Sequence, residues 1–195
     1  ANKGIGYETA RQLVLASHTV WIGSRDLARG RAAAEKLGAR AVQLDITDDA
    51  SVAAAAATIE ALDVLVNNAA VEERGDGNAV IGPVDVTADL VRTTFDTNVF
   101  GTVRVLHAFL PLLQRSAAPV VVNVSSGLGS LTVVSSIPAD VYPGVAYPAS
   151  KAAVNVITVQ YAKAFPAMRI NAADPGFTKT DLNGSTGTQT VEEGV

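Results

Sequence analysis

Tyr147 and Lys151 are the two residues whose types and spacing fit proton transfer. A free tyrosine has a pKa of about 10, so its phenol is a reluctant acid or base near neutral pH. Side chains four residues apart on a helix lie on one face, and an ammonium beside a phenol stabilises the phenolate. Lys151 follows Tyr147 by four residues, which makes the pair a candidate general acid and base. The alternative is an ordinary aromatic residue and charge at a helix start.

Two serines, Ser125 and Ser126, follow the β-branched run at residues 120–124. A hydroxyl at the carboxyl end of a strand can donate a hydrogen bond to an oxygen on which negative charge develops. Because side chains alternate along a strand, the two serines point to opposite sides. The spacing alone does not choose between them, and both could simply end the strand.

A glycine-rich segment opens the chain, with Gly4-Ile5-Gly6 directly before an amphipathic helical pattern. Glycines there let the backbone approach a ligand closely, and the free N–H groups of a helix N-terminus suit a phosphate. A tight turn into a helix explains the same residues equally well. This motif alone is therefore weak.

Arg25 is a second candidate for phosphate binding, because it follows the strand-like residues 19–23. Dinucleotide-binding folds that prefer NAD carry a carboxylate near the end of this strand, whereas here Ser24 and Arg25 stand in that place. A guanidinium can bind a 2′-phosphate through two hydrogen bonds, and Lys3 would add a second positive charge. One such contact favours NADPH by roughly ten- to a hundredfold. The alternative is a solvated Arg25 paired with Asp26.

Short β-branched runs alternate with longer alanine-rich stretches along the chain, which predicts βαβ units and a parallel sheet. The strands are almost wholly apolar, as expected where helices cover both faces. We therefore predict an α/β fold, a Rossmann-like doubly wound parallel sheet with helices on both faces. Strands are predicted at residues 19–23, 41–44, 63–66, 120–124 and 169–172, and helices at 26–37, 48–62, 87–96, 98–113 and 149–165.

The two ends of the chain and two internal segments do not fit this alternation. No strand precedes the first helix, and the polar residues 183–195 cap no element. A parallel sheet without its first strand exposes interior strand edges. We therefore expect residues 1–195 to be a single domain, a fragment that lacks its first strand and C-terminal elements. Residues 71–86 are predicted to be an exposed loop, and residues 127–146 a long link of a length that is often functional.

Composition and charge exclude several classes of protein. The chain has 195 residues, a net charge of −4, no cysteine and two histidines. The absence of cysteine excludes disulfides, thiolate chemistry and cysteine-bound zinc, and two distant histidines argue against a His-rich metal site. The charge does not favour nucleic acid or a membrane surface. With no membrane span or signal segment in the pattern, we expect a soluble, cytoplasmic protein.

Several segments, taken in order, resemble motifs of the short-chain dehydrogenase/reductase family over essentially the whole chain. Ala1-Asn2-Lys3-Gly4-Ile5-Gly6 resembles the end of its TGxxxGIG phosphate loop, Asp45 the acid that contacts adenine, and Asn67-Asn68-Ala69-Ala70 its NNAG element with Ala70 in place of Gly. The family's helix asparagine is matched by Thr97-Asn98-Val99-Phe100-Gly101, and its serine strand by Val122-Asn123-Val124-Ser125-Ser126. Its YxxxK motif resembles Tyr147-Pro148-Ala149-Ser150-Lys151, and its PGxxxT motif resembles Asp174-Pro175-Gly176-Phe177-Thr178-Lys179-Thr180. Each motif alone is weak, but the ordered set is specific.

The resemblance implies a catalytic tetrad of Asn98, Ser126, Tyr147 and Lys151. Tyr147 is then the general acid in reduction and the base in oxidation, Ser126 binds the substrate oxygen, and Lys151 also binds the nicotinamide ribose. Asn98 would hold a water that relays protons toward Lys151. The implied cofactor-binding residues are Asn2, Lys3, Gly4, Ile5, Gly6, Arg25, Asp45, Ile46, Asn67, Ala69, Tyr147, Lys151, Pro175, Gly176, Thr178 and Thr180, and no metal is implied.

The pattern is most similar to NADPH-dependent carbonyl reductases. It implies reversible reduction of a ketone or aldehyde, with a hydride from NADPH and a proton from Tyr147, on a small-molecule carbonyl or alcohol substrate. Two rival functions are a 3-oxoacyl-thioester reductase on the same scaffold and a non-catalytic NADP(H)-binding sensor. Residues 127–146 should form one wall of the substrate pocket, with an apolar lining from Val133, Val134, Ile137 and Val141. The family includes dimers and monomers, so the resemblance leaves a homo-oligomer and a monomer both open.

Overall fold

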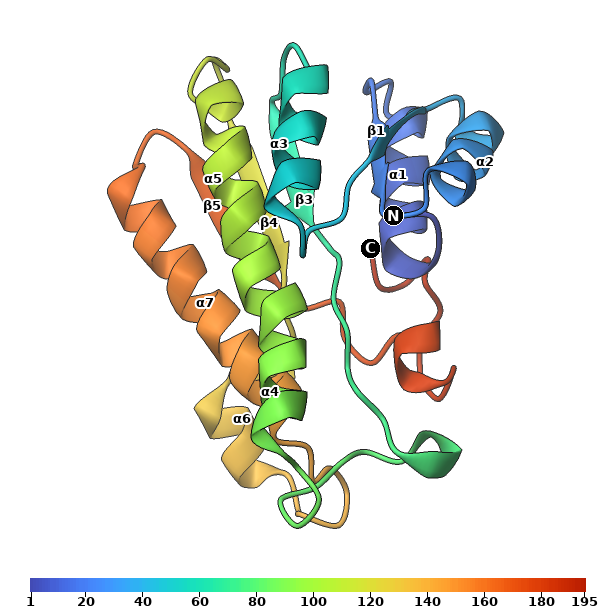
Figure 1. Ribbon diagram of the computed structural model, residues 1–195, viewed down its shortest axis with the longest axis vertical. Helices are drawn as coiled ribbons and strands as arrows, with labels where there is room; N and C mark the ends of the chain where they lie inside the picture. The colour runs from blue at the N-terminus through green and yellow to red at the C-terminus, as the bar shows by residue number, and fades with distance from the viewer.

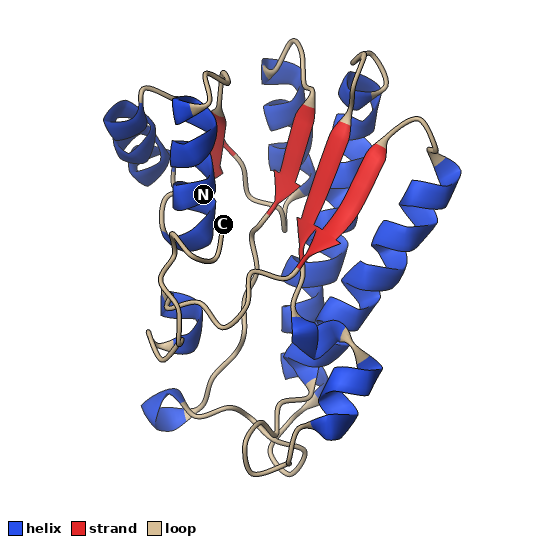
Figure 2. Ribbon diagram, turned by 180° about the vertical axis from the view of Figure 1, so that it is seen from behind, coloured by secondary structure: helices blue, strands red, loops and turns tan.

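The computed structural model describes residues 1–195 and contains five strands, all paired in parallel. The strands are β1 (Trp21–Ser24), β2 (Arg40–Gln43), β3 (Val64–Asn67), β4 (Val120–Val124) and β5 (Arg169–Ala173). They pair in two groups: β1 pairs with β2, and β3, β4 and β5 pair in that order. Figure 2 shows the two groups of strands side by side. The α/β class and the parallel pairing are confirmed.

Helices connect the strands and lie around them (Figure 1). The α-helices are α1 (Gly4–Leu15), α2 (Leu27–Leu37), α3 (Asp49–Thr58), α4 (Ala88–Phe95), α5 (Thr102–Leu113), α6 (Leu131–Ser136) and α7 (Ala146–Ala164). Shorter helical segments are η1 (Asp76–Asn78), η2 (Asp96–Gly101), η3 (Gly127–Gly129) and η4 (Asp181–Asn183). None of the helices is both long and apolar enough to cross a membrane.

Side-chain caps explain where three of the helices begin. Asp26 accepts a hydrogen bond from the N–H of Arg29, Asp48 from that of Ala50, and Thr87 from that of Leu90. Such caps satisfy N–H groups that have no partner within the helix. Local sequence therefore sets these helix starts.

Helix α3 ends at Thr58, earlier than the predicted Leu62. Ile59 adopts an extended backbone, with φ of −100° and ψ of 120°, and its side chain is buried against α5. Burial of this apolar side chain outweighs the helical tendency of the alanine run before it.

The predicted pair of helices at residues 87–96 and 98–113 is one continuous helical rod. α4 passes into α5 through η2, a π-helical turn over Asp96–Gly101. Gly101 in this turn packs closely on the loop after β2, because a Cβ there would lie 2.7 Å from Cδ1 of Ile46. Turns of this kind widen the helix locally and are frequent at functional sites.

Two layers of helices cover the strands from opposite sides. Trp21 and Ile22 are neighbours on β1 and therefore point to opposite faces. Ile22 packs with α1 and α2, whereas Trp21 packs on the cluster built from α3 and α5. α7 and α5 pack on β4 and β5 through residues that include Leu106, Val121 and Ile170. Helices on both faces are thus confirmed.

The carboxyl ends of the strands lie at the same edge of the layer, as parallel pairing requires. Ser24, Asn67 and Asn123 end or nearly end their strands there. The loops that follow the five strands carry half of the residues predicted to bind cofactor or substrate, namely Arg25, Asp45, Ile46, Ala69, Ser126, Pro175, Gly176, Thr178 and Thr180.

Candidate active site

Tyr147 lies in the first turn of α7, because the helix begins at Ala146 and not at the predicted Ala149. Pro148 is compatible with a first turn, where its missing N–H has no partner to lose. Lys151 Nζ is 5.5 Å from the centre of the Tyr147 ring. Its side chain is buried and donates a hydrogen bond to the carbonyl oxygen of Val124 at 2.7 Å. The ammonium therefore ties α7 to the end of β4.

Burial and nearby charges shift both ionisable groups. Burial lowers the pKa of Lys151 to about 8. Burial also raises the pKa of Tyr147, and the carboxylates of Glu72 and Asp174 raise it further, against smaller opposing effects of Ser126 and Arg74. The expected lowering of the Tyr147 pKa by Lys151 is therefore absent, because burial and two carboxylates dominate. The phenol is held in its protonated form.

Ser125 and Ser126 point to different partners. The buried Ser125 hydroxyl donates to Oδ1 of Asn155 at 2.6 Å. Ser126 lies at the Tyr147 phenol, where its hydrogen bond lowers the Tyr147 pKa, and its hydroxyl oxygen accepts the N–H of Leu128 at 3.2 Å. Of the two serines, only Ser126 is thus placed to contact an oxygen beside Tyr147.

Asn98 lies in the π turn and is 2% exposed. Its amide oxygen accepts the N–H of Val71 at 2.8 Å, and its amide nitrogen donates to the Val71 carbonyl at 2.8 Å and to Ser150 Oγ at 3.0 Å. The side chain is therefore engaged with the loop after β3 and the residue before Lys151. It holds these two segments together.

The glycine-rich start of the chain packs against two other predicted cofactor segments. Gly4 has a positive φ of 58°, and a Cβ on it would lie 3.5 Å from Cγ2 of Thr180. A Cβ on Gly6 would lie 2.6 Å from the amide nitrogen of Asn68. Lys3, at the N-cap of α1, makes no side-chain cap, so the first N–H groups of the helix keep their capacity to bind an anion.

The positive residues near this helix are mostly exposed. Lys3 pairs with Asp181 at 2.5 Å, with the two side chains 66% and 70% exposed. Lys3 also lines a depression of about 440 Å³ together with Asn2, Arg29 and Lys36. Arg29 was not predicted as a cofactor-binding residue. It lies in the first turn of α2 and pairs with Asp26, the N-cap of this helix, and this position near a predicted helix start is the signal that could have found it.

Arg25 is exposed and lies near Asp45 at the end of β2. Hydrogen bonds from the hydroxyl and the N–H of Thr47 lower the pKa of Asp45, and the charge of Arg25 adds a smaller lowering. The two residues come from separate sequence segments. The fold brings them together at the carboxyl edge of the β1–β2 sheet.

The remaining predicted residues divide between this edge and the interior. Asn67 donates to Asn123 Oδ1 at 2.8 Å and so faces β4, whereas Ala69 is exposed.

Thr178 is buried, donates to the Pro175 carbonyl at 2.9 Å and accepts from Gln189 at 3.0 Å. Unlike Thr180, it does not lie next to the glycine-rich segment. Ile5 is half-buried, and Gly176 has a positive φ of 70°.

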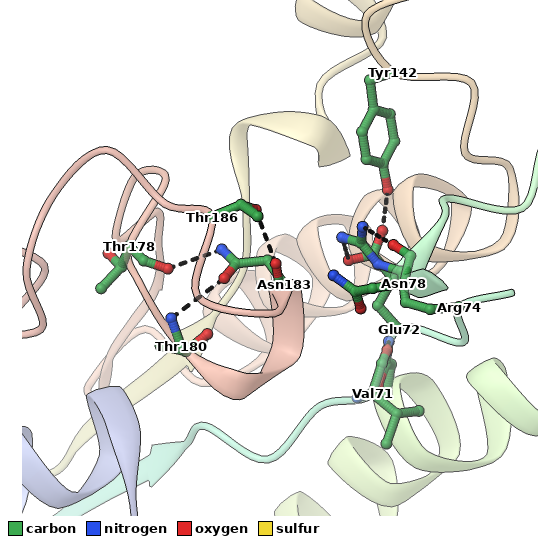
Figure 3. A network of polar contacts seen from close by, with 10 residues as sticks. Val71, Glu72, Arg74, Asn78, Tyr142, Thr178, Thr180, Asn183 and Thr186 are labelled. Carbon is green, nitrogen blue, oxygen red and sulfur yellow. Dashed lines mark hydrogen bonds and ion pairs between the residues drawn. The ribbon is translucent and has the colours of Figure 1, made fainter. Parts of the chain in front are cut away.

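Three residues beside Tyr147 escaped the sequence analysis: Glu72, Arg74 and Tyr142. Figure 3 shows Tyr142 directed at the Glu72–Arg74 pair, with Asn78 beside it. In contrast, Val133 and Val141, predicted to line the pocket, are 40% and 69% exposed. The sequence signal was slight: Glu72 and Arg74 are charged residues in the predicted exposed loop, and Tyr142 lies in the long link at residues 127–146.

A cavity of about 690 Å³ lies between β5 and α7. Ser126 and Asp174 line it, but Tyr147 and Lys151 do not. The cavity therefore does not locate the reacting group.

The sequence matches the short chain dehydrogenase family over residues 1–190. It is 34% identical over 256 residues to Short-chain dehydrogenase/reductase 1 of Saponaria officinalis, with 100% of this chain and 85% of that protein covered. It is 33% identical over 255 residues to the (+)-neomenthol dehydrogenase of Arabidopsis thaliana, with 100% and 86% covered. The structure of NADPH-bound carbonyl reductase from chicken fatty liver is similar with a TM-score of 0.88 at 26% identity, covering 100% of this chain and 81% of that chain.

These similarities run along nearly all of the chain and include both the strands and the loops that carry the site. The family's members are oxidoreductases that use a nicotinamide cofactor on small molecules. The chain therefore belongs to the short-chain dehydrogenase/reductase family and is an oxidoreductase that acts on an alcohol or carbonyl group.

Proposed function

We propose that the protein reduces a ketone or an aldehyde reversibly with NADPH, and that Tyr147 supplies the proton. The observation that carries the proposal is the grouping of Tyr147, Ser126 and Lys151 where β4 ends. The Ser126 hydroxyl lies at the phenol, and Lys151 Nζ lies 5.5 Å from the ring centre. Names of relatives, a neomenthol dehydrogenase and an NADPH-bound carbonyl reductase, agree with this chemistry.

The residues around the N-terminus of α1 fit a dinucleotide. A Cβ on Gly6 would clash with the amide of Asn68, and the positive φ of Gly4 disfavours a side chain there. The helix N–H groups suit the pyrophosphate. Bound NADPH would supply the hydride. In this proposal the remaining contacts come from the residues named above, among them Asn2, Ile5, Asp45, Ile46, Asn67, Ala69, Pro175, Gly176, Thr178 and Thr180.

In reduction, Tyr147 donates its phenolic proton to the substrate oxygen, and Ser126 donates a hydrogen bond to the same oxygen. Burial and the two nearby carboxylates raise the pKa of Tyr147, which keeps its phenol protonated before the reaction. Because the pKa of Lys151 is about 8, its ammonium remains charged at neutral pH and stabilises the phenolate that forms. Asn98 acts as a positioning residue through Val71 and Ser150.

A preference for NADPH over NADH follows from the positive charges at the first sheet. Arg25 is exposed beside Asp45, and Lys3 and Arg29 line one depression near the start of α1. A guanidinium bound to a phosphate forms a pair of charge-assisted hydrogen bonds. The 2′-phosphate of NADPH is therefore the group we assign to these residues.

The test is the rate of NADPH consumption with a panel of aldehydes and ketones, with NADH in parallel. Tyr147→Phe should lower kcat by about 10²- to 10⁴-fold, the usual contribution of a general acid. Tyr161→Phe on the same helix, away from the site, is the matched control and should keep its rate. Tight NADPH binding without turnover would instead indicate a sensor, and a preference for NADH would contradict the roles of Lys3 and Arg25.

A further inference from the structure

Asn155 lies on α7, four residues after Lys151, beside the point where the chain leaves β4. Residues four apart on a helix share a face, so Asn155 and Lys151 both lie on the face of α7 that meets the end of β4. The amide oxygen of Asn155 accepts the hydroxyl of Ser125 at 2.6 Å, and its amide nitrogen donates to the carbonyl oxygen of Gly129 at 3.3 Å. One side chain thus binds the chain on both sides of Ser126.

The segment that contains Ser126 approaches α7 very closely. A Cβ on Gly129 would lie 2.7 Å from the amide nitrogen of Asn155 and 2.8 Å from the carbonyl carbon of Lys151. Only glycine allows the backbone to come this near to a helix. Ser125, at the other end of the segment, is 5% exposed. The five residues from Ser125 to Gly129 are therefore held against the helix at both ends.

The position of the Ser126 hydroxyl depends on this backbone. Its oxygen accepts the N–H of Leu128 at 3.2 Å, and a hydroxyl that accepts one hydrogen bond can still donate its own proton. A donor contributes to catalysis only when it is held where negative charge develops. A displacement of about 1 Å can lower a rate about 10²-fold. Whatever fixes the two ends of this segment therefore also sets the direction of the Ser126 O–H.

We propose that Asn155 is a positioning residue, which fixes the backbone on both sides of Ser126 so that the Ser126 hydroxyl points at the substrate oxygen. Asn155 acts through its hydrogen bonds to Ser125 and Gly129 and touches neither the substrate nor the cofactor. This inference rests on the proposed carbonyl reduction and adds to that reaction a residue outside the predicted tetrad.

Thr158 makes a comparable link that does not reach Ser126. It lies on α7 three residues after Asn155, is 4% exposed, and accepts a hydrogen bond from the amide nitrogen of Asn123 at 2.8 Å. Both links join α7 to β4, so the loss of either should destabilise the fold. Only the Asn155 link holds the residues next to Ser126. Thr158 is therefore the matched control that separates a role in stability from a role in positioning.

The experiment is a double-mutant cycle on kcat for Asn155→Ala and Ser126→Ala, with NADPH and either 4-nitrobenzaldehyde or cyclohexanone, whichever the wild type reduces faster. Ser126→Ala should lower kcat about 10²- to 10³-fold. Asn155→Ala alone should lower kcat about ten- to a hundredfold and leave the dissociation constant of NADPH unchanged. In the Ser126→Ala background the same substitution should lower kcat less than about twofold, because residues that act as a unit are not additive.

Two further variants complete the test. Thr158→Val should reduce stability to urea as Asn155→Ala does but keep the wild-type kcat. Ser125→Ala removes one of the two links to Asn155 and should reproduce part of the loss in kcat, again only when Ser126 is present. If Asn155→Ala does not fold, Ser125→Ala takes its place in the cycle.

Two results would overturn this inference and leave the proposed function standing, provided that the wild type reduces a carbonyl. One is an equal loss of kcat from Asn155→Ala with and without Ser126, and the other is an equal loss from Thr158→Val. If the wild type reduces no aldehyde or ketone, the proposed function is overturned, and this inference is overturned with it.

Discussion

Two groups of polar side chains differ in how the fold holds them. The reaction end is Asn98, Ser126, Tyr147 and Lys151, and the phosphate end is Lys3, Arg25 and Arg29. At the reaction end, Asn98 and Lys151 are 2% and 3% exposed and are hydrogen-bonded to backbone groups of other elements. At the phosphate end, the Lys3 and Arg29 side chains are 66% and 74% exposed, and their partners are also largely exposed.

This difference separates stability from affinity. A buried polar group that loses its partner leaves an unsatisfied donor or acceptor in the interior, so changes at the reaction end should alter both folding and chemistry. Exposed ion pairs contribute little to stability and are screened by salt. Changes at the phosphate end should therefore alter cofactor choice while the fold remains unaffected.

The strongest test of this contrast is Asn98→Ala. The substitution leaves both backbone groups of Val71 without a partner and removes a donor to Ser150 Oγ, which should lower the free energy of unfolding by about 3 kcal/mol. Urea unfolding measures it. Asn171→Ala on the exposed side of β5 is the control. If Asn98→Ala loses no more unfolding free energy than the control, the reaction end does not depend on buried hydrogen bonds in the way described.

The pH dependence of stability offers a second test, through Lys151. Burial lowers the pKa of Lys151 to about 8 from its usual value of 10.5. The unfolded chain therefore binds more protons than the folded chain between pH 8 and 10.5, and stability should rise with pH across this window. Below about pH 8 Lys151 is charged in both the folded and the unfolded chain, so this gain in stability is absent.

Lys151→Met isolates that contribution. Between pH 8 and 10 the wild type should gain on the order of 2 kcal/mol relative to the variant, from at most about 1.4 kcal/mol per pH unit for one proton. Urea unfolding at both pH values gives the difference. Above pH 10 the raised pKa values of Tyr142 and Tyr147 work in the opposite direction, because the unfolded phenols ionise first. Parallel curves for the two proteins would show that the ammonium is well solvated.

The smallest effect is expected at the phosphate end, for Arg25→Ala. The affinity for NADPH should fall about tenfold, that for NADH should stay the same, and the NADPH difference should shrink as salt is added. Titration of cofactor fluorescence measures all three. Arg31→Ala, an exposed arginine of α2, is the control. Equal losses for both cofactors would mean that Arg25 does not recognise the 2′-phosphate.

Sequence predicted those parts of the fold that depend on local pattern. The strand at residues 120–124 was placed with its observed bounds, and the helices predicted to begin at residues 48 and 87 begin there, at the caps Asp48 and Thr87. The end of α3 was missed because burial of Ile59 depends on α5, which comes much later in the chain.

The candidate site divides in the same way. Tyr147 and Lys151 were found because their spacing is local, and the motifs around them supplied the order of the rest. Tyr142 and Glu72 were missed because they lie 70 residues apart and meet only after both loops fold. The raised pKa of Tyr147 was missed for the same reason, since it comes from burial and from carboxylates on two other loops.

The π turn between α4 and α5 accommodates an extra residue within one continuous helical rod. A π turn has i→i+5 hydrogen bonds and so holds one residue more than an α turn. Deleting one residue between Asp96 and Gly101 would therefore let the turn close as regular α-helix, and Leu106 and Phe109 would keep about their present places in the core. The extra residue thus affects the position of Asn98 within the turn far more than the packing of α5.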